Sequence, residues 1–474
     1  MATALPVNPL NDPNPIVTVQ VSTVQGPIPF NYQQMGALIS HGGTSLANQN
    51  IALLTQYSDL TAILKAAGPI SSITWSLNTV TVTTQNPHNL ATATNVSINI
   101  TNCAPTGYNG VYTCYITGAN TFTYPLAVNP GTATTNGSWQ SMSAVELTAM
   151  AYTFFAQRPG ISVYVLELGE AAASTTIAAL QTWLTNNPLS FYNYLCPRYW
   201  DADPTDFLSL LAAYDSPEGL TYFWVTSTIT TYSQYPATYK CAFVGVEAPS
   251  VTTTGTEFTM AANFFNAVQF KATSVTRVAP MCYRYVYGVT AYPPQNNGPL
   301  LKELKTANVN YVRTGAEGGI SNTMIYPGTT IDGNDFFNWW WTIDWVQITV
   351  NENISNAIIN GSNNPLAPLY YDQNGINFLL AVLAQTMTSA QQFGMVNGQI
   401  VQTEYNTSEL ANQIALGTFA AKCDCNAVPF IDYSVANPGD YAKGEYDGLS
   451  TLFIPARGFV HVLIQVVASS LVTV

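Results

Sequence analysis

The segment DFFNWWWTIDWVQITV, Asp335–Val350, carries two Phe and four Trp within eleven residues, in a chain where only 8% of residues are charged. Apolar residues then recur at intervals of three and four, at Ile343, Val346, Val350, Ile354 and Ile358. This spacing places one apolar stripe along a helix. We therefore predict a long amphipathic helix that has the aromatic cluster at its beginning.

The aromatic cluster cannot face a single environment, because three consecutive Trp cannot all point to one side of a regular element. At least one of Trp339, Trp340 and Trp341 is expected to point away from its own domain's core, toward solvent or a neighbouring subunit. We favour a role in the core and in a subunit interface over ligand stacking. The residues concerned are Phe336, Phe337, Trp339, Trp340, Trp341 and Trp345.

Three more segments flank this region with clear patterns. A second amphipathic helix is predicted from Ile376, Leu379, Leu380, Leu383, Met387 and Phe393. The chain closes with GFVHVLIQVVASSLVTV, a β-prone tail that has no charge after Arg457. Near the beginning, IVTVQVST over Ile16–Thr23 is predicted to be a strand with Val17, Val19 and Val21 on one face.

The middle of the chain alternates apolar strands with helices. The strands are ISVYVLEL, SFYNYLCP, LTYFWVT and CAFVGVE, and the helices are predicted over 144–157, 175–185, 205–214 and 258–268. Upstream, MGALISH over Met35–His41 reads as a buried strand, followed by a helix over 48–67. This alternation predicts βαβ units and a mostly parallel sheet.

Between Ala66 and Val145 no Asp, Glu, Lys or Arg occurs, and short strands are separated by Pro, Gly and Asn turns. We predict an all-β module inserted into the host domain. The fold class is α/β (mixed α+β) and multidomain. A mostly parallel α/β domain carries the small all-β insertion, and an α+β core domain is completed by the N- and C-terminal strands. The predicted divisions are 1–23, 24–67, 68–141, 142–327, 328–457 and 458–474.

The charge balance restricts the classes of partner. The net charge is −13, with 13 Lys and Arg that we read as spread along the chain, which argues against nucleic-acid binding. No apolar run reaches the roughly 18 residues needed to span a bilayer, and no signal peptide is visible, so we expect a soluble product folded in a cytoplasm. The low charge fits either a surface covered by other subunits or a secreted β-rich protein with a Thr/Asn surface.

The residues that usually carry chemistry do not form a recognisable set. The three His, at 41, 88 and 461, lie in unrelated contexts, and Cys423 and Cys425 lack the further ligands of a zinc site. HGGTS, residues 41–45, has no nucleophile elbow to accompany it, so a strand-to-helix turn is favoured. We predict no catalytic, cofactor-binding or metal-binding residue. A disulfide between Cys103 and Cys114 and a spatially formed pair of glycosidase carboxylates stay open.

Two blocks of the sequence resemble the contractile tail sheath proteins of bacteriophages. They are GTTIDGNDFFNWWWTIDWVQITVNENISNAIING and PLYYDQNGINFLLAVLAQTMTSAQQFGMVNGQI. In that family a D-W dipeptide opens one helix and a Y-x-D-x-G-I turn opens the next. The matching positions here are Asp344, Trp345, Tyr370, Asp372, Gly375 and Ile376. The resemblance extends to the two β-prone ends and is weaker through the α/β middle, and the FFNWWW run is more aromatic than the family pattern.

The resemblance implies a virion structural protein, with no enzyme activity and no cofactor, that forms stacked hexameric rings around a tail tube and contracts. Its partners would be copies of itself, the tube, the baseplate and the tail terminator, without nucleic acid or membrane insertion. Terminal arms would pair with strands of neighbouring subunits, through Ile16, Val17, Val19, Val21, Phe459, Val460, Val462, Ile464 and Val466. The alternatives are a carbohydrate-binding adhesin or glycosidase that uses exposed aromatics, and another tail or baseplate component.

Overall fold

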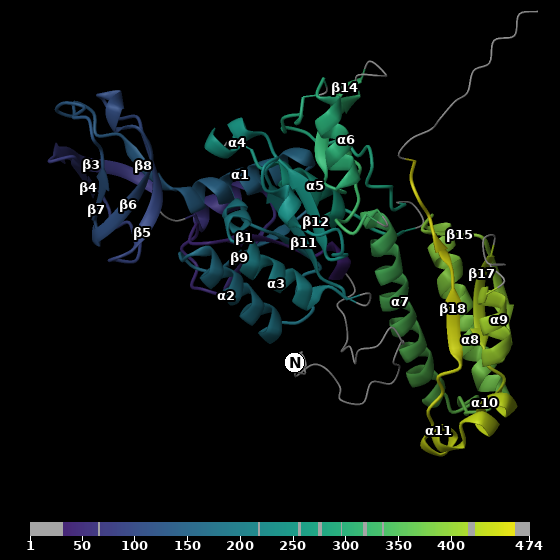
Figure 1. Ribbon diagram of the computed structural model, residues 1–474. Coiled ribbons are helices and arrows are strands. Elements are labelled where there is room, and N and C mark those ends of the chain that lie inside the picture. The colour runs from purple at the N-terminus through teal and green to yellow at the C-terminus, as the bar shows by residue number, and fades with distance from the viewer. Residues whose placement is uncertain are drawn as a thin grey trace, which may run out of the picture.

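The computed structural model describes residues 32–64, 67–216, 219–254, 257–273, 277–294, 296–315, 320–333, 336–415 and 422–459 (Figure 1). The predicted strand over Ile16–Thr23 lies outside the described residues, as does the closing tail beyond Phe459. The predicted fold class is confirmed for the described parts: a mostly parallel α/β domain carries an all-β insertion and is joined to a C-terminal α+β region.

The centre of the molecule is a six-stranded sheet with the order β12-β11-β10-β1-β9-β2. All neighbouring strands are parallel except β2, which pairs antiparallel with β9. Crossover helices cover both faces of such a sheet, which explains why its strands are nearly continuous apolar runs. The strands are β1 (Gly36–Ser40), β2 (Ile51–Leu54), β9 (Val163–Glu167), β10 (Asn193–Leu195), β11 (Tyr222–Ser227) and β12 (Ala242–Val246).

The two faces of the sheet form separate cores. In β11, Tyr222 and Trp224 belong to one core while Phe223 and Val225 belong to the other, as the alternation of side chains along a strand requires. Helices α1 (Met142–Gln157) and α5 (Thr259–Val268) cover the first face. Helices α2 (Ala173–Asn186) and α3 (Pro204–Tyr214) cover the second. Short α4 (Pro249–Thr254) follows β12.

The helix predicted over 48–67 is wrong. The chain instead forms β2 and then a 3-10 helix over Tyr57–Ala62. Residues Ile51–Leu54 pair with β9 at the edge of the sheet, and the Asp59 carboxylate accepts from the backbone N–H groups of Thr55 and Gln56. Pairing with the sheet and this local turn override the helical propensity of the segment.

The inserted module is a closed barrel with the strand order β3-β4-β7-β6-β5-β8, set apart from the other described elements in Figure 1. It has its own core, which includes Val80, Ile98 and Phe122. Cys103 and Cys114 are buried there as free thiols. The strands are β3 (Ala67–Ser76), β4 (Thr79–Thr84), β5 (Asn95–Thr101), β6 (Gly110–Gly118), β7 (Thr121–Pro125) and β8 (Ser138–Ser141).

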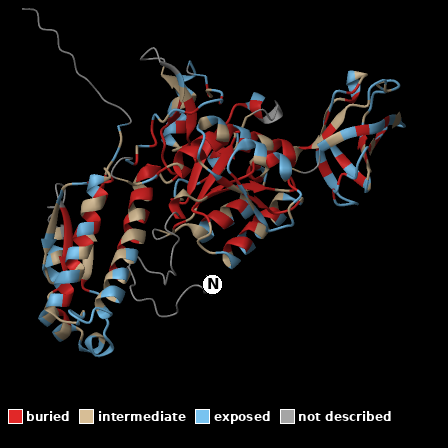
Figure 2. Ribbon diagram, turned by 180° about the vertical axis from the view of Figure 1, so that it is seen from behind, coloured by how far each residue is buried: buried red, intermediate tan, exposed pale blue. Residues whose placement is uncertain are grey.

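Both predicted amphipathic helices are present in the C-terminal region, as α7 (Phe337–Ser362) and α8 (Gln373–Gln392). The family pattern predicts that Asp344 and Trp345 open the helix. Helix α7 instead begins at Phe337, so these two residues lie inside it. The helix starts earlier because Phe337 and Trp341 are themselves buried against the central sheet. Figure 2 shows the buried residues along the facing sides of these helices.

A small sheet packs on α8 in the order β16-β17-β18, and β15 pairs separately with β19. These strands are β15 (Val396–Asn397), β16 (Gln399–Thr403), β17 (Lys422–Ala427), β18 (Leu449–Leu452) and β19 (Ile454–Pro455). The remaining elements are α6 (Gly298–Thr306), the hairpin of β13 (Tyr311–Gly315) and β14 (Ile320–Tyr326), α9 (Thr407–Ala415), α10 (Phe430–Ala436) and α11 (Pro438–Lys443).

In the part of the chain that the structure describes, no helix combines the length and apolarity needed to cross a bilayer.

Phe337 is the residue through which α7 is most tightly packed on the sheet. It is fully buried, and its ring lies close to the rings of Tyr192, Tyr222, Trp224, Phe243 and Phe270. We expect Phe337→Ala to lower the free energy of unfolding by about 3–5 kcal/mol, because it removes a buried ring and leaves a cavity. Phe378→Ala, at a half-exposed site on α8, is the matched control and should cost far less. Urea unfolding of both variants measures this, and equal losses would contradict the packing described.

Candidate functional site

The aromatic cluster at the start of α7 is directed mostly into the chain. Trp341 is buried and packs on Phe270, and its carbonyl oxygen accepts from Gln33 Nε2 at 2.9 Å. Trp345 is half-buried against Phe393. Phe336 is buried with the core on the opposite face of the sheet. Part of the aromatic cluster thus packs in the core, as we interpreted it from the sequence. Its role in a subunit interface stays a prediction.

Trp339 and Trp340 each lie beside a cation. The Trp340 ring covers the ammonium of Lys240 at 4.8 Å, and its indole N–H donates to Thr330 Oγ1 at 3.2 Å. The guanidinium of Arg457 lies 4.2 Å from the centre of the Trp339 ring. Both indoles are half-buried. An aromatic face that already holds a cation gains from this contact and is not free for stacking on a sugar.

Asp344 joins α7 to the central sheet. Its Oδ2 accepts from the hydroxyl groups of Tyr192 at 2.6 Å and Tyr222 at 2.9 Å, and its Oδ1 lies 3.8 Å from Lys240 Nζ. Burial raises the pKa of this carboxyl above its usual value, and the charge of Lys240 and the two hydroxyls oppose that shift only in part. The carboxyl group is fully buried. Its hydrogen bonds connect α7 to residues that are far away in sequence.

The root of the C-terminal tail is attached to the same end of α7. Asn338 Nδ2 donates to the Ala456 carbonyl at 3.3 Å, and the Ala456 N–H donates to the Met395 carbonyl at 2.7 Å. The next residue is Arg457, which lies on Trp339. Phe459, the last described residue, is 79% exposed. The chain is therefore anchored at Ala456 and Arg457, and the other predicted arm residues of the C-terminus lie outside the described ranges.

The small C-terminal sheet has β16 and β18 as its edge strands among the described residues. Within the described residues, β16 and β18 each pair only with β17, in parallel and antiparallel registers respectively. An open groove of about 530 Å³ runs beside β16 along α8. It is lined by the uncharged side chains of Ala381, Ala384, Gln385, Thr388, Ile400 and Gln402. Exposed strand edges are sites at which another chain adds a strand.

The turn before α8 has a clear physical basis. Asp372 is the N-cap of α8, and its Oδ1 accepts from the Gly375 N–H at 2.8 Å. A Cβ at Gly375 would meet the carbonyl oxygen of Tyr370 at 2.0 Å, so only glycine fits there. Ile376 is buried, whereas the Tyr370 side chain is exposed. The motif thus encodes the entry into α8, and whether Tyr370 serves an interface stays a prediction.

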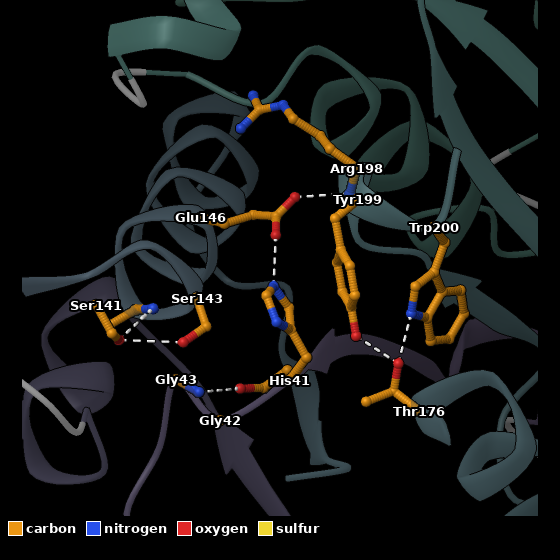
Figure 3. A network of polar contacts seen from close by, with 12 residues as sticks. His41, Gly42, Gly43, Ser141, Ser143, Glu146, Thr176, Arg198, Tyr199 and Trp200 are labelled. Carbon is orange, nitrogen blue, oxygen red and sulfur yellow. Dashed lines mark hydrogen bonds and ion pairs between the residues drawn. The ribbon is translucent and has the colours of Figure 1, made fainter. Parts of the chain in front are cut away.

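A polar network that the sequence did not reveal lies at the carboxyl end of the central sheet (Figure 3). Helix connections leave β1 and β10 on opposite faces, and such a switch point is the usual ligand site of open α/β sheets. Here Glu146 of α1 occupies it. Its carboxylate lies 2.8 Å from His41 Nε2 and accepts from the Arg198 backbone N–H at 2.6 Å. Arg198 Nε in turn donates to Glu247 Oε1 at 2.6 Å.

The loop after β1 is bound by a second carboxylate. Glu167, at the end of β9, accepts from the backbone N–H groups of Gly42, Thr44 and Gly169 and from the hydroxyls of Ser40 and Thr44. The HGGTS segment is therefore a loop whose N–H groups serve an internal carboxylate, and it leads to β2 and not to a helix. The only sequence signal was a Gly-rich loop after a buried strand, which does not identify its acidic partner.

The carboxylates of this network have different surroundings. For Glu146, burial raises the pKa, but the hydrogen bond from His41 and the charges of His41 and Arg198 outweigh it, so the pKa lies below the usual 4.5. For Glu247, burial dominates over the attraction of Arg198 and the pKa is raised. Since these groups bond to one another, the arrangement connects β1, α1 and β10 through the protein's own side chains.

The remaining candidates for chemistry are separated. His88 and the pair Cys423 and Cys425 are buried in the barrel and on β17 respectively. His461 lies outside the described residues. Among the described residues, no group of three or more His, Cys, Asp or Glu side chains is placed to hold a metal ion.

Comparison with known proteins gives structural likenesses only. No family model and no curated protein matches the chain. The sheath tail protein Lin1278 from Listeria innocua aligns over 79% of this chain and 86% of its own, with 10% identity and a TM-score of 0.39. The helical sheath of the anti-feeding prophage (AFP), in its contracted state, aligns over 95% of this chain and 99% of its own, with 9% identity and a TM-score of 0.48. Both of these structures are sheath proteins.

The contact between Asp344 and Lys240 can be tested by a double-mutant cycle. We expect Asp344→Ala to cost about 3–5 kcal/mol of stability, because it removes the buried acceptor of the Tyr192 and Tyr222 hydroxyls and a negative charge 3.8 Å from the ammonium of Lys240. The double variant Lys240→Met with Asp344→Ala should lose less than the sum of the two single variants. Urea unfolding gives all three values, and strictly additive losses would show that the two charges do not interact.

The lowered pKa of Glu146 predicts a pH dependence. Because the pKa of Glu146 is lower in the folded chain than its usual value of 4.5, the ionised carboxylate stabilises the folded state at pH values above 4.5. This stabilisation is lost as the pH falls through the pKa of the folded state. We expect Glu146→Gln to have a lower melting temperature than the wild type at neutral pH. The difference between the two melting temperatures should become smaller in acid. Glu352→Gln, at an exposed site on α7, is the control and should show no such change. A gap that stays constant with pH would argue against this role.

Proposed function

We propose that this chain is the structural subunit of a contractile phage tail sheath. It polymerises as stacked rings, expected to be hexameric, around a tail tube, and it contracts to drive the tube through the host envelope. The support in the sequence is the pair of blocks around α7 and α8. The support in the structure is a C-terminal region that offers strand edges among the described residues and a C-terminal segment anchored at Ala456 and Arg457.

The observation that carries the proposal is the open edge of β16 beside the groove along α8. Ile400 and Gln402 line this groove from the strand, and Ala381 and Ala384 line it from the helix. A strand added beside β16 would extend the small sheet over α8 and satisfy the free backbone groups of the edge. The predicted occupants are the terminal arms of neighbouring copies, since both ends of the chain are β-prone and poor in charge.

No bond chemistry is needed for this function. Backbone hydrogen bonds of the arms keep subunits connected while the folded bodies rotate and repack against each other. The extended state is held by a kinetic barrier, and free energy is released as larger interfaces form on contraction. The barrel, which has its own core, projects to the outside, because an insertion facing the tube would obstruct sliding.

The proposed partners follow from this arrangement. They are other copies of the chain, the tail tube, the baseplate and the tail terminator. The protein is assembled in the host cytoplasm and functions in the virion tail, without binding nucleic acid and without inserting into a membrane. The α/β domain weighs against a role as the tube itself, whose subunits are expected to be smaller and nearly all β.

Removal of the C-terminal arm tests the proposal. We expect the full chain at high concentration to form tubes or stacked rings in negative-stain electron microscopy. A chain lacking Gly458–Val474 should keep its circular dichroism and melting temperature but stay dispersed, because the edge of β16 then lacks an incoming strand. A chain lacking Met1–Asp12, upstream of the predicted N-terminal strand, is the matched control and should assemble.

Two outcomes would count against the proposal. Normal tubes from the chain lacking Gly458–Val474 would exclude the C-terminal arm as the connector. A full chain that stays monomeric and binds a glycan array, with binding lost in Trp340→Ala, would favour the carbohydrate-binding alternative.

A further inference from the structure

The basic residues are not spread evenly, which corrects our reading of the sequence. Six of the 13 Lys and Arg lie between residues 271 and 313, a stretch that contains a single acidic residue, Glu303. The chain as a whole has a net charge of −13. A strongly acidic protein therefore has one basic region. Its members are Lys271, Arg277, Arg284, Lys302, Lys305 and Arg313.

Part of this region forms one surface with exposed tyrosines, which we call the basic face: α6, the β13–β14 hairpin and residues 283–287. The Tyr326 ring is its centre, with Arg313 at 5.2 Å, Lys305 at 5.9 Å and the Tyr283 ring at 5.7 Å. Tyr283, Tyr285 and Tyr287 are all exposed, and Tyr285 pairs with Met324 of β14. Tyrosine and arginine are the residues most enriched at the energetic centres of protein interfaces.

A second surface has the opposite charge, and we call it the acidic face: α10, α11 and the chain to Asp447. It has four acidic residues, Asp432, Asp440, Glu445 and Asp447, against one cation, Lys443. It also exposes Ile431, Val435 and Tyr441, which no described element covers, and the loop before α8 exposes Leu366 and Tyr370.

The acidic face is firmly built. The rings of Tyr371, Phe430, Tyr441 and Tyr446 pack on each other beneath it. Tyr371 also donates its hydroxyl proton to the Glu445 carbonyl at 2.8 Å. The exposed Ile431 and Val435 therefore stand on an ordered base, and covering them would not require the chain to fold further.

The two faces lie at opposite ends of the molecule. Figure 1 shows α6 and β14 at the top and α10 and α11 at the bottom, by the lower ends of α7 and α8. They cannot meet within one chain. Two basic faces would repel one another, as would two acidic faces, so a symmetric pairing is disfavoured. A contact between unlike faces of two copies is heterologous, and repetition of such a contact builds rings or open filaments.

We propose that the basic face of one copy docks on the acidic face of the next copy. Lys302, Lys305 and Arg313 meet Asp432, Glu445 and Asp447, and the exposed tyrosines cover the apolar side chains of α10. The inference deepens the proposed function, on which it rests, because it names a contact between copies that is separate from the arms. The charge part of the contact weakens with salt, since the screening length is about 10 Å at 0.1 M ionic strength.

Charge reversal with mixing tests this contact. Lys302→Glu reverses the basic face and Asp432→Lys reverses the acidic face, and both residues are exposed. Each variant alone should need a severalfold higher concentration than the wild type to assemble. An equal mixture of the two should assemble nearly as well as the wild type, because each reversed face then meets a reversed partner. Arg158→Glu and Glu352→Lys, at exposed sites on other surfaces, are the controls and should leave assembly unchanged.

The outcomes separate this inference from the proposed function. Loss of assembly in each variant with recovery in the mixture supports the contact. A wild type that assembles while both reversed variants assemble equally well overturns the inference and leaves the sheath proposal standing. Loss without recovery in the mixture also overturns it, since the effect is then not one of complementary charge. A wild type that never assembles, in the same microscopy, contradicts both.

Discussion

The buried carboxylate of Asp344 lies where α7 meets the central sheet, and the connection between the two halves of the molecule depends on it. A buried charge costs free energy unless it is paired and hydrogen-bonded. Asp344 accepts hydrogen bonds from the hydroxyls of Tyr192 and Tyr222, and it is paired with the ammonium of Lys240. Those donors come from different parts of the α/β domain, so the pairing exists only when α7 is correctly seated. Helix α7 has 26 residues in all, and it also packs against α8.

The same use of carboxylates recurs throughout this charge-poor chain. Glu146, Glu167 and Asp201 each accept hydrogen bonds from several backbone or side-chain donors that are distant in sequence. A carboxylate can accept at four lone-pair positions, so a single side chain can hold several loops at once. At the carboxyl end of the sheet this fills the position that ligands usually take in related architectures. The loops of the α/β domain are thereby held together by the protein's own carboxylates.

The exposed features of the molecule gather elsewhere. The β16 edge and its groove offer backbone hydrogen bonds, whereas the basic and acidic faces offer charge and aromatic surface. In the proposed sheath, strand addition would keep copies connected while their folded bodies rotate. The contact between the basic and acidic faces would depend on the relative position of the two surfaces and on salt. The proposed change of geometry without dissociation would use both kinds of contact.

The sequence by itself determined the local patterns. The three-and-four spacing from Ile343 to Ile358 predicted α7, the alternation of strands and helices predicted the parallel sheet, and the charge-free stretch after Ala66 with its short strands predicted an all-β insertion. Each of these signals is a local pattern of residue types that can be read along the chain. The segment 51–62 was misread because its pairing with β9 is not encoded locally.

Only the tertiary structure decided which side chains meet. It placed Trp340 over Lys240, Arg457 over Trp339, and Glu146 between His41 and Arg198. Partners separated by about 50 to 120 residues leave no periodic signal in a single sequence. The α10–α11 end likewise became a surface only when the rings beneath it packed together. Local propensity acts over a few residues, whereas charge pairing and burial depend on the path of the whole chain through space.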